Sequence, residues 1–374
     1  MKIIADENIA LASDAFSGFG EVELYPGRKI TNEILKNADA LVIRSITNVN
    51  EKLLKNTKVG FVGTATIGWD HLDTEYLDRT GIKYSSAAGC NSDAVAEYVT
   101  SALFDIAVKH KISLKDKKIG IIGTGNIGSR VARIAAAAGM NVLLNDPPLA
   151  KKTGSSKYLP LHELFKCDII TLHVPLNMTG KFKTFHLFDE ENLSLLKDHT
   201  IFFNTSRGPV VDNNALLNII KRKNLITILD VWEHEPKINK ELLSLTEIAT
   251  PHIAGYSFEG KINGTKMIYD ELCRFAGFIP GWKYSPQDIP ELIELKKEGS
   301  FEERINGVIK NIYDIRTDDA DLRKISGISD DEIPHYFDNL RKNYKLRREF
   351  FNYTVTSDEP DLQAAKAFEA MRFK

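Results

Sequence analysis

The sequence predicts an α/β protein built on parallel β-sheets. Over residues 1–90, and again over residues 118–250, short apolar runs of strand length alternate with apolar residues at helical spacing. This alternation is typical of parallel strands joined by crossover helices. A glycine-rich turn follows one of the apolar runs, and a composition break with three prolines in residues 280–290 precedes a more charged, mostly helical tail. At 374 residues the chain has room for two or three domains.

The strongest local signal lies in residues 118–139. An apolar run at residues 119–122 leads into a G-x-G-x-x-G motif, and an alanine-rich helical pattern follows. The motif consists of Gly123, Thr124, Gly125, Asn126, Ile127 and Gly128. Its first glycine permits a tight turn, its second lets a pyrophosphate approach the backbone, and its third lets the helix pack on the strand. This stretch predicts a Rossmann dinucleotide site.

The cofactor specificity is predicted from Asp146, which ends the next apolar run, 18 residues after the last glycine of the motif. A carboxylate at this distance can accept hydrogen bonds from the hydroxyls of the adenosine ribose. It would also repel a 2′-phosphate. The sequence therefore predicts NAD, and not NADP, as the cofactor.

The strand and helix patterns divide the first 280 residues into two domains. Residues 1–90 carry five strand-like runs without a glycine motif, which predicts a small flavodoxin-like α/β domain acting as substrate or lid domain. Residues 91–257 are predicted to form the NAD-binding domain, which begins with a long helix at 91–109 and contains a doubly wound sheet. A helix over about residues 258–280 is expected to return to the first domain.

Residues 286–374 are predicted to form a small α+β domain after a proline-rich linker. Amphipathic spacing indicates helices at 301–314, 330–344 and 361–371, and residues 350–355 (FFNYTV) indicate a strand. This strand has no evident partner in the segment, and an unpaired strand edge favours pairing with another chain. We therefore expect a homodimerisation domain that carries no catalytic group and whose removal leaves a monomer able to bind NAD.

Composition and charge exclude several classes of protein. The net charge is −2 with 27% charged residues, so no basic excess indicates nucleic acid or a membrane surface as partner. The apolar runs are too short to span a bilayer, and the first residues lack a secretory signal. The three cysteines are far apart, which predicts free thiols in a reducing compartment and no metal site. We expect a cytoplasmic protein.

Charged side chains follow three predicted strands of the second domain. Arg207 follows the run at 200–204, Glu235 follows the run at 226–231, and His252 follows the run at 248–250. Ligands bind at the carboxyl ends of strands in open α/β sheets, so these groups are expected to converge there. A base to take a hydroxyl proton, a cation to hold a carboxylate and an acid to orient the base are the groups needed to oxidise a hydroxy acid.

These motifs resemble the signatures of the D-isomer-specific 2-hydroxyacid dehydrogenase family. The matching motifs are N-x-x-R-G at 204–208, D-V-x-x-x-E-P at 230–236 and P-H-x-x-G at 251–255. Within this family the chain is similar to the erythronate-4-phosphate dehydrogenases, through residues 5–8, 43–47, 63–73, 87–91, 252–261, 313–319 and 346–350. The resemblance implies a homodimer that oxidises 4-phospho-D-erythronate at C2 with NAD, in the biosynthesis of pyridoxal 5′-phosphate.

The same resemblance implies roles for individual residues. Arg207 would hold the substrate carboxylate, Glu235 would pair with the imidazole, and His252 would act as acid and base. The implied substrate contacts are Ser45, Thr66 and Tyr256. The implied cofactor contacts are Gly123, Gly125, Asn126, Ile127, Gly128, Asp146, Val174, Thr205, Ser206, Asp230 and Gly255.

The resemblance leaves the roles of two residues open. The family often has threonine where this chain has Val174, so any contact there would be through the backbone or apolar packing. Arg44 is expected either to meet the substrate phosphate or to pair with a surface acid.

Two other functions are compatible with these residues. One is a dehydrogenase for another 2-hydroxy acid, such as 3-phosphoglycerate or glycerate. The other is a non-enzymatic NAD-sensing binding protein on the same fold. The intact set of Arg207, Glu235 and His252 favours an enzyme over the sensing protein.

Overall fold

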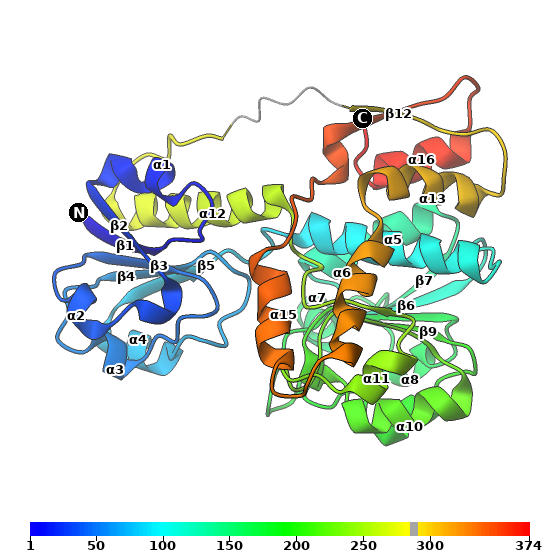
Figure 1. Ribbon diagram of the computed structural model, residues 1–374, viewed down its shortest axis with the longest axis horizontal. Helices are drawn as coiled ribbons and strands as arrows, with labels where there is room; N and C mark the ends of the chain where they lie inside the picture. Colours follow the sequence, from blue (N-terminus) through cyan, green and yellow to red (C-terminus); the bar gives the residue numbers. More distant parts are fainter. Residues whose placement is uncertain (285–290) are drawn as a thin grey trace. The chain divides into compact units, whose positions relative to one another are not determined.

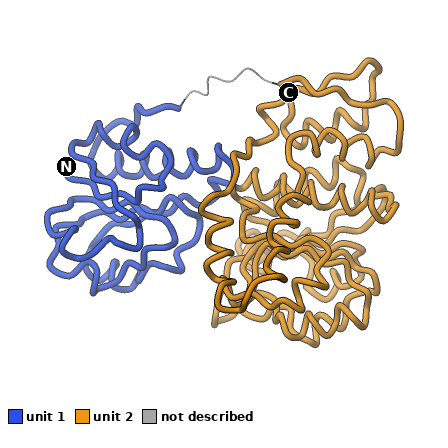
Figure 2. The backbone as a smooth tube through the Cα atoms, in the orientation of Figure 1, with its two compact units in different colours: residues 1–91, 257–288 blue, residues 92–256, 289–374 orange. Residues whose placement is uncertain are grey.

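The computed structural model describes residues 1–284 and 291–374 and divides the chain into two compact units. Unit 1 comprises residues 1–91 and 257–288, and unit 2 comprises residues 92–256 and 289–374 (Figure 2). Each unit is built around its own parallel sheet. The predicted linker at residues 280–290 lies partly outside the described residues.

Unit 1 contains a five-stranded parallel sheet with the order β2-β1-β3-β4-β5. This is the strand order of flavodoxin-like folds, so the predicted fold class is confirmed. The strands are β1 (Lys2–Asp6), β2 (Glu21–Tyr25), β3 (Ala40–Ile43), β4 (Phe61–Thr64) and β5 (Lys83–Ser86). The helices are α1 (Ala12–Phe16), α2 (Asn32–Leu35), α3 (Glu51–Leu54), α4 (Thr74–Thr80) and α12 (Phe258–Ala276).

The helix α12 belongs to the same compact unit as residues 1–91. Its buried residues Ile268 and Leu272 pack with Ile3, Ala5 and Phe16 in one apolar cluster. Glycine at position 63 of β4 is required by this packing, because a Cβ there would lie 2.4 Å from Cγ2 of Ile268. The return of the chain to its first domain is therefore fixed by close helix-on-strand contact.

Unit 2 contains a six-stranded parallel sheet with the order β11-β10-β9-β8-β6-β7. Between β6 and β8 the strand order reverses, which is the switch point where doubly wound sheets bind ligands. The strands are β6 (Lys118–Ile122), β7 (Asn141–Asn145), β8 (Ile169–Leu172), β9 (Ile201–Asn204), β10 (Ile226–Leu229) and β11 (Ile248–Ala249). The helices that accompany them are α5 (Ser92–Lys109), α6 (Asn126–Ala137), α7 (Pro147–Thr153), α8 (Leu161–Leu164), α9 (Glu190–Ser194), α10 (Asn213–Lys223) and α11 (Lys240–Leu245), labelled where there is room in Figure 1.

Successive residues of a strand in this sheet are buried in two different apolar cores, one on each face of the sheet. Phe203 and Ile228 belong to the core that contains α5 and α6, whereas Phe202 and Leu229 belong to the core that contains α10 and α11. Side chains alternate between the faces of a strand, so strands covered by helices on both faces read as continuous apolar runs. This is why the sequence shows them as short, unbroken apolar stretches.

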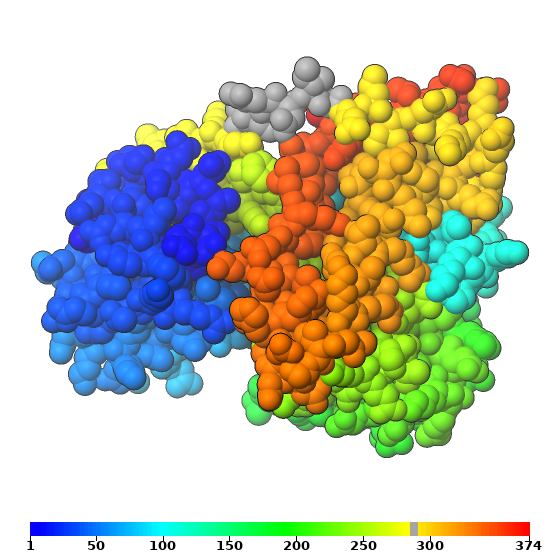
Figure 3. All heavy atoms as spheres, in the orientation of Figure 1, coloured from blue at the N-terminus to red at the C-terminus, as the bar shows by residue number. Residues whose placement is uncertain are grey.

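The C-terminal segment packs directly on this sheet and its helices. It contains β12 (Glu291–Glu294), α13 (Phe301–Ile312), α14 (Ile315–Arg323), α15 (Ile333–Lys342), β13 (Tyr353–Thr356) and α16 (Leu362–Ala370). In the space-filling view the orange α14 and α15 lie against the green residues of the same unit (Figure 3). Helix α13 contacts α5, α14 contacts β11, and α16 contacts α6.

The prediction of an unpartnered strand in this segment is wrong. The strand begins at Tyr353, because residues 350–352 form a 3₁₀ turn, and it pairs in parallel with β12 of the same segment. The partner was missed because its sequence, ELIE, is short and carries a charge at each end. Pairing between residues some sixty positions apart leaves no local signal in the sequence.

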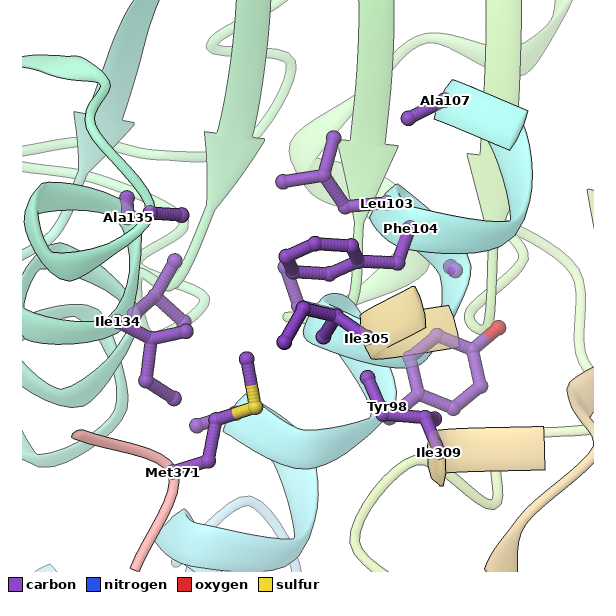
Figure 4. Close-up of a cluster of buried hydrophobic side chains, with 14 of the residues drawn as sticks. Tyr98, Leu103, Phe104, Ala107, Ile134, Ala135, Ile305, Ile309 and Met371 are labelled. Atoms are coloured by element: carbon purple, nitrogen blue, oxygen red, sulfur yellow. The ribbon is translucent and has the colours of Figure 1, made fainter. Parts of the chain in front are cut away.

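The segment also shares its apolar core with the NAD-binding part of the chain. Ile305, Ile309 and Met371 lie among Leu103 and Phe104 of α5, as Figure 4 shows. On the other face of the sheet, Phe337 of α15 lies in the core that contains β9 and β10. The segment is therefore a structural part of unit 2.

Within the described residues, no helix combines the length and the apolar character that crossing a lipid bilayer requires.

Candidate active site

Three loops at the carboxyl edge of the unit 2 sheet form the candidate active site. They follow β9, β10 and β11, which are neighbours in the sheet, and they carry Arg207, Glu235 and His252. Because parallel strands end at a common edge, the structure brings these three predicted residues into one unit and to one side of the sheet.

Asn204 fixes the loop that presents Arg207. Its Oδ1 accepts hydrogen bonds from the backbone N–H (3.1 Å) and the hydroxyl (2.8 Å) of Ser206, and its Nδ2 donates to the carbonyl of Arg207 (3.0 Å). Nη1 of Arg207 donates to the carbonyl of Ser206 at 2.8 Å. Thr205 and Ser206 are both buried. The first residue of the N-x-x-R-G motif thus holds the loop in a single conformation.

The glycine of the same motif joins this loop to the next one. A Cβ at Gly208 would lie 1.9 Å from the carbonyl oxygen of Trp232, so only glycine allows the two backbones to approach. The backbone N–H of Trp232 in turn donates to Oε1 of Glu235 at 2.8 Å. Gly208 therefore ties the loop of Arg207 to the loop that orients Glu235.

Glu235 and His252 form a direct hydrogen-bonded pair. Nδ1 of His252 lies 2.7 Å from Oε2 of Glu235. Burial alone would raise the pKa of Glu235, but the charge of His252, the hydrogen bonds from His252 and Trp232, and the charge of Arg341 hold that pKa below its ordinary value. Glu235 is therefore a carboxylate that can accept a hydrogen bond from Nδ1–H, and in that tautomer Nε2 carries the lone pair of the imidazole.

Asp230 positions the loop that carries His252. Its carboxylate accepts hydrogen bonds from the backbone N–H groups of Ile253 (2.7 Å) and Ala254 (3.0 Å) and from the hydroxyl of Thr250 (2.7 Å). Burial raises the pKa of Asp230 above its ordinary value, against the charge of His252 and these hydrogen bonds. The resemblance implies a cofactor contact for Asp230, and the structure shows its carboxylate already engaged within the loop.

The backbone of His252 is held in an uncommon conformation. Its φ is 57°, in the left-handed region, and its N–H donates to the carbonyl of Asp230 at 2.7 Å. Such conformations cost energy and persist where surrounding contacts fix them, often at functional sites. The resulting turn places Gly255 and Tyr256 immediately beyond His252.

The glycine motif adopts the geometry that a dinucleotide requires. Gly123 has φ 83°, and a Cβ at Gly128 would lie 2.0 Å from the carbonyl oxygen of Gly123. A Cβ at Gly125, in contrast, would meet no atom of the described chain within 4 Å. The N-terminus of α6, at Asn126 and Ile127, has no side-chain cap. The exposed N–H groups and the open space beside Gly125 fit a pyrophosphate.

Asp146 is tied to the same loop. Its Oδ2 accepts from the backbone N–H (2.8 Å) and the hydroxyl (3.2 Å) of Thr124, and its Oδ1 accepts from the N–H of Leu149 at 2.9 Å. A carboxylate offers about four lone-pair positions, so acceptor capacity remains for a ribose hydroxyl. The ribose-binding role of Asp146 stays a prediction from the spacing.

The residues after β8 lie beside the glycine turn. A Cβ at Gly123 would come within 2.9 Å of Cγ1 of Val174, so this valine can offer apolar packing there. His173 is hydrogen-bonded through Nε2 to Thr171 (2.9 Å) and through Nδ1 to Thr205 (3.4 Å). Burial lowers the pKa of His173 to about 3, so it is a neutral, packed side chain.

The two other predicted substrate residues lie in unit 1. Ser45 is exposed in the turn after β3, and Thr66 follows the neighbouring strand β4, with its hydroxyl 2.7 Å from that of Thr64. They therefore share one edge of that sheet. Arg44 donates from Nε to Oδ2 of Asp6 at 3.2 Å, and the Asp6 side chain is fully buried, so the acid that Arg44 meets is not a surface group.

Sequence reasoning missed Arg341, which we expected to lie in a segment without functional groups. Its guanidinium carbon lies 5.9 Å from the centroid of the Tyr256 ring, and its charge acts on Glu235. Tyr344 packs edge-on against the same ring, with 5.8 Å between centroids. No motif marks Arg341, because it reaches the site only through the packing of α15 on the sheet.

The fold and the site are those of a dehydrogenase for 2-hydroxy acids. The model of the family described as D-isomer specific 2-hydroxyacid dehydrogenase, NAD binding domain, matches residues 94–254. The D-lactate dehydrogenase of Aquifex aeolicus, solved with NAD and lactic acid, is 28% identical with a TM-score of 0.59, over 74% of this chain and 96% of that one. The NAD-bound 3-phosphoglycerate dehydrogenase of Entamoeba histolytica is 26% identical with a TM-score of 0.62, over 74% and 95% of the two chains.

A curated relative extends the likeness to nearly the full length. The erythronate-4-phosphate dehydrogenase of Proteus mirabilis is 44% identical over 371 residues, covering 96% of both chains. The chain belongs to the erythronate-4-phosphate dehydrogenase family, within the NAD-binding D-isomer-specific 2-hydroxyacid dehydrogenases. Residues 286–372 match a model described only as a domain of unknown function (DUF3410).

The position of Asp146 leads to a prediction about cofactor choice. We expect kcat/KM with NAD to exceed that with NADP by more than about tenfold, because the Asp146 carboxylate would repel the 2′-phosphate of NADP. Two like charges about 4 Å apart repel by roughly 1 kcal/mol in water and roughly 4 kcal/mol near a protein surface. Initial rates with the two cofactors at saturating substrate measure the ratio. Equal rates with both would contradict this role of Asp146.

Proposed function

We propose that the protein oxidises 4-phospho-D-erythronate at C2 to 3-hydroxy-2-oxo-4-phosphobutanoate, with NAD as cofactor, in the biosynthesis of pyridoxal 5′-phosphate. The observation that carries the proposal is the Glu235–His252 pair, placed with Arg207 at the carboxyl edge of an NAD-binding sheet. The full-length likeness to erythronate-4-phosphate dehydrogenases supports the choice of substrate.

The residues divide the chemistry among them. NAD, when bound along the glycine motif and Asp146, supplies the hydride acceptor. His252 takes the proton of the C2 hydroxyl at Nε2, while Glu235 holds Nδ1–H and stabilises the imidazolium that forms. Arg207 binds the C1 carboxylate and polarises the oxygen that becomes the C2 carbonyl. The hydrogen on C2 leaves as hydride, and the proton of the C2 hydroxyl moves to Nε2 of His252. The C2–O single bond becomes a double bond in the same step.

The pairing predicts a shift in the pH dependence of the reaction. Oxidation needs the neutral imidazole, so the rate rises as His252 loses its proton. Glu235→Gln removes a negative charge beside the imidazole that favours its protonated form, so the pH of half-maximal kcat/KM should fall. A pH–rate series on both proteins measures the shift.

Glu233→Gln is the matched control, because Glu233 pairs with Nε2 of His186 at 2.5 Å and not with His252. The pH–rate profile of Glu233→Gln should match that of the wild type. An unshifted profile for Glu235→Gln would show that the pair does not set the protonation of the base.

NADH formation with a panel of acids tests the proposed function. We expect 4-phospho-D-erythronate to give the highest kcat/KM, above 3-phosphoglycerate and glycerate. A higher value with one of those acids would assign the enzyme to a different 2-hydroxy acid. NAD binding without turnover of any of them would favour an NAD-sensing protein.

We also propose a homodimer in the cytoplasm. The single described neighbour of β12 is β13, which leaves a strand edge, and Leu292 and Leu362 are 69% and 78% exposed in this segment. Such an edge and exposed leucines favour association with a second copy. The cysteines Cys90, Cys167 and Cys273 are buried and are not joined by disulfides, which supports a reducing compartment. Light scattering should give twice the chain mass of 42.0 kDa.

A further inference from the structure

We propose that Arg341, together with Tyr256, forms the subsite that binds the terminal phosphate of the substrate. The inference rests on the proposed function and deepens it, because it assigns the phosphate to a residue of the segment described only as a domain of unknown function. The segment would then complete the active site of its own chain, in addition to any part in a dimer.

The packing of α15 determines where Arg341 lies. Ile333, Phe337 and Arg341 are spaced four residues apart and therefore share one face of the helix. Ile333 and Phe337 are buried in the apolar core that also contains Trp232. The backbone of Trp232 holds Glu235 by a hydrogen bond. The face that anchors α15 thus carries Arg341 to the loop of Glu235 and to Tyr256.

The guanidinium of Arg341 has donors to spare. It makes a side-chain hydrogen bond with Tyr256, but its buried Nε has no hydrogen-bond partner within the described part of the chain. Both oxygens of Glu235 are already engaged, one by Trp232 and the other by His252. A buried N–H without an acceptor is costly, and an anionic ligand would supply one.

The guanidinium of Arg341 stays positively charged. Burial opposes the charged form, but Tyr256, Glu235 and Asp338 raise the pKa of Arg341 above its ordinary value. A guanidinium presents its donors in a planar fork that matches two oxygens of a phosphate. The site therefore offers a permanent cation with an unsatisfied Nε–H donor beside a residue implied to contact substrate.

The chemistry of the substrate calls for a second cation. 4-Phospho-D-erythronate carries a carboxylate at one end and a phosphate at the other, and Arg207 accounts for the carboxylate. The cations of unit 1 are less suited, because Arg44 is paired with Asp6 and because burial and the charge of Arg44 lower the pKa of Lys261. Arg341 is the arginine that lies beside Tyr256 and Glu235 in unit 2.

The test compares two substrates that differ only in the phosphate, 4-phospho-D-erythronate and D-erythronate. Charge-assisted hydrogen bonds contribute enough that Arg341→Gln should lower kcat/KM for the phosphorylated acid roughly 10- to 100-fold, mainly through KM. The value for D-erythronate should change by less than about twofold. Arg341→Lys should restore part of the loss, since it keeps the charge without the planar fork.

Lys342→Gln is the matched control, because it removes an exposed cation from the adjacent position of α15. It should leave the ratio of the two substrates unchanged. Inorganic phosphate gives a second measurement, since it should compete with 4-phospho-D-erythronate in the wild type and much less in Arg341→Gln.

Each outcome decides the proposal. Equal losses on both substrates would overturn it and make Arg341 a positioning residue for Glu235 and Tyr256. Unchanged kinetics would overturn it in favour of a phosphate site elsewhere, such as Arg44 and Lys261. If the proposed function itself is wrong, the wild-type enzyme will prefer another acid. That result comes from the wild type alone and does not depend on any variant.

Discussion

Replacing His252 with alanine should lower kcat by roughly 10²- to 10⁴-fold, which is the usual contribution of a positioned acid–base group. The substitution removes the imidazole that is hydrogen-bonded to Glu235 and that we propose as the acceptor of the hydroxyl proton. NAD should bind with nearly unchanged affinity, because the glycine motif and Asp146 lie in other loops, after β6 and β7. Steady-state kinetics and a titration of NAD measure the two effects separately.

His234→Ala is the matched control for this substitution. His234 is exposed and immediately precedes Glu235, so it shares the loop but takes no part in the hydrogen bond between Glu235 and His252. It should retain wild-type activity. A comparable loss in His234→Ala, or a His252→Ala variant that keeps most of its kcat, would contradict the assignment of the base.

Deleting residues 285–374 should destroy NAD binding along with the fold of unit 2. This expectation replaces the sequence-based one of a removable dimerisation module. The segment fills cores on both faces of the sheet, with Ile309 and Phe350 on one face and Phe337 on the other. Its loss would expose these apolar surfaces to water, and a domain of this size has only about 5–15 kcal/mol of stability to lose.

The deletion would also leave buried polar groups without partners. Asp105 of α5 pairs with Nε of Arg316 at 2.6 Å and with Lys310 at 3.0 Å. The backbone N–H of Ala249, in the strand that leads to His252, donates to Oδ1 of Asp319 at 2.8 Å. Unpaired buried charges and donors destabilise strongly. Circular dichroism and NAD titration of the truncated chain measure the result.

Two point substitutions provide a graded form of the same test. Ile309→Ala, at a fully buried position, should reduce the free energy of unfolding by about 2–5 kcal/mol. Leu362→Ala, at a position that is 78% exposed, should leave it nearly unchanged in the monomer. A truncated protein that folds and binds NAD with wild-type affinity would show that the segment is separable after all.

Elements with local signals could be predicted from the sequence. The turn of Gly123 and the packing of Gly128 follow from a strand, a tight turn and a helix that are contiguous in the chain. The long helix predicted at residues 91–109 and the return helix predicted from residue 258 were found as α5 and α12. Hydrophobic periodicity over ten or more residues gives such elements a clear signature.

The meeting of Glu235 with His252 could also be predicted, although the two residues are 17 positions apart. Each follows a strand of the same parallel sheet, and neighbouring parallel strands end at one edge. The sequence could not show that the Asp230 carboxylate accepts hydrogen bonds from two N–H groups of the His252 loop. That result depends on the exact path of the loop after β11.

The place of the C-terminal segment could not be predicted in this way, because it depends on long-range packing. The pairing of β12 with β13, the sharing of both cores and the approach of Arg341 to Tyr256 all join residues far apart in the chain. A short charged strand and a single arginine on an amphipathic helix have no periodicity that distinguishes them from solvent-exposed residues. Their partners are selected by the burial of apolar surface when the whole unit folds, and that choice is a property of the packed chain and not of any local stretch of it.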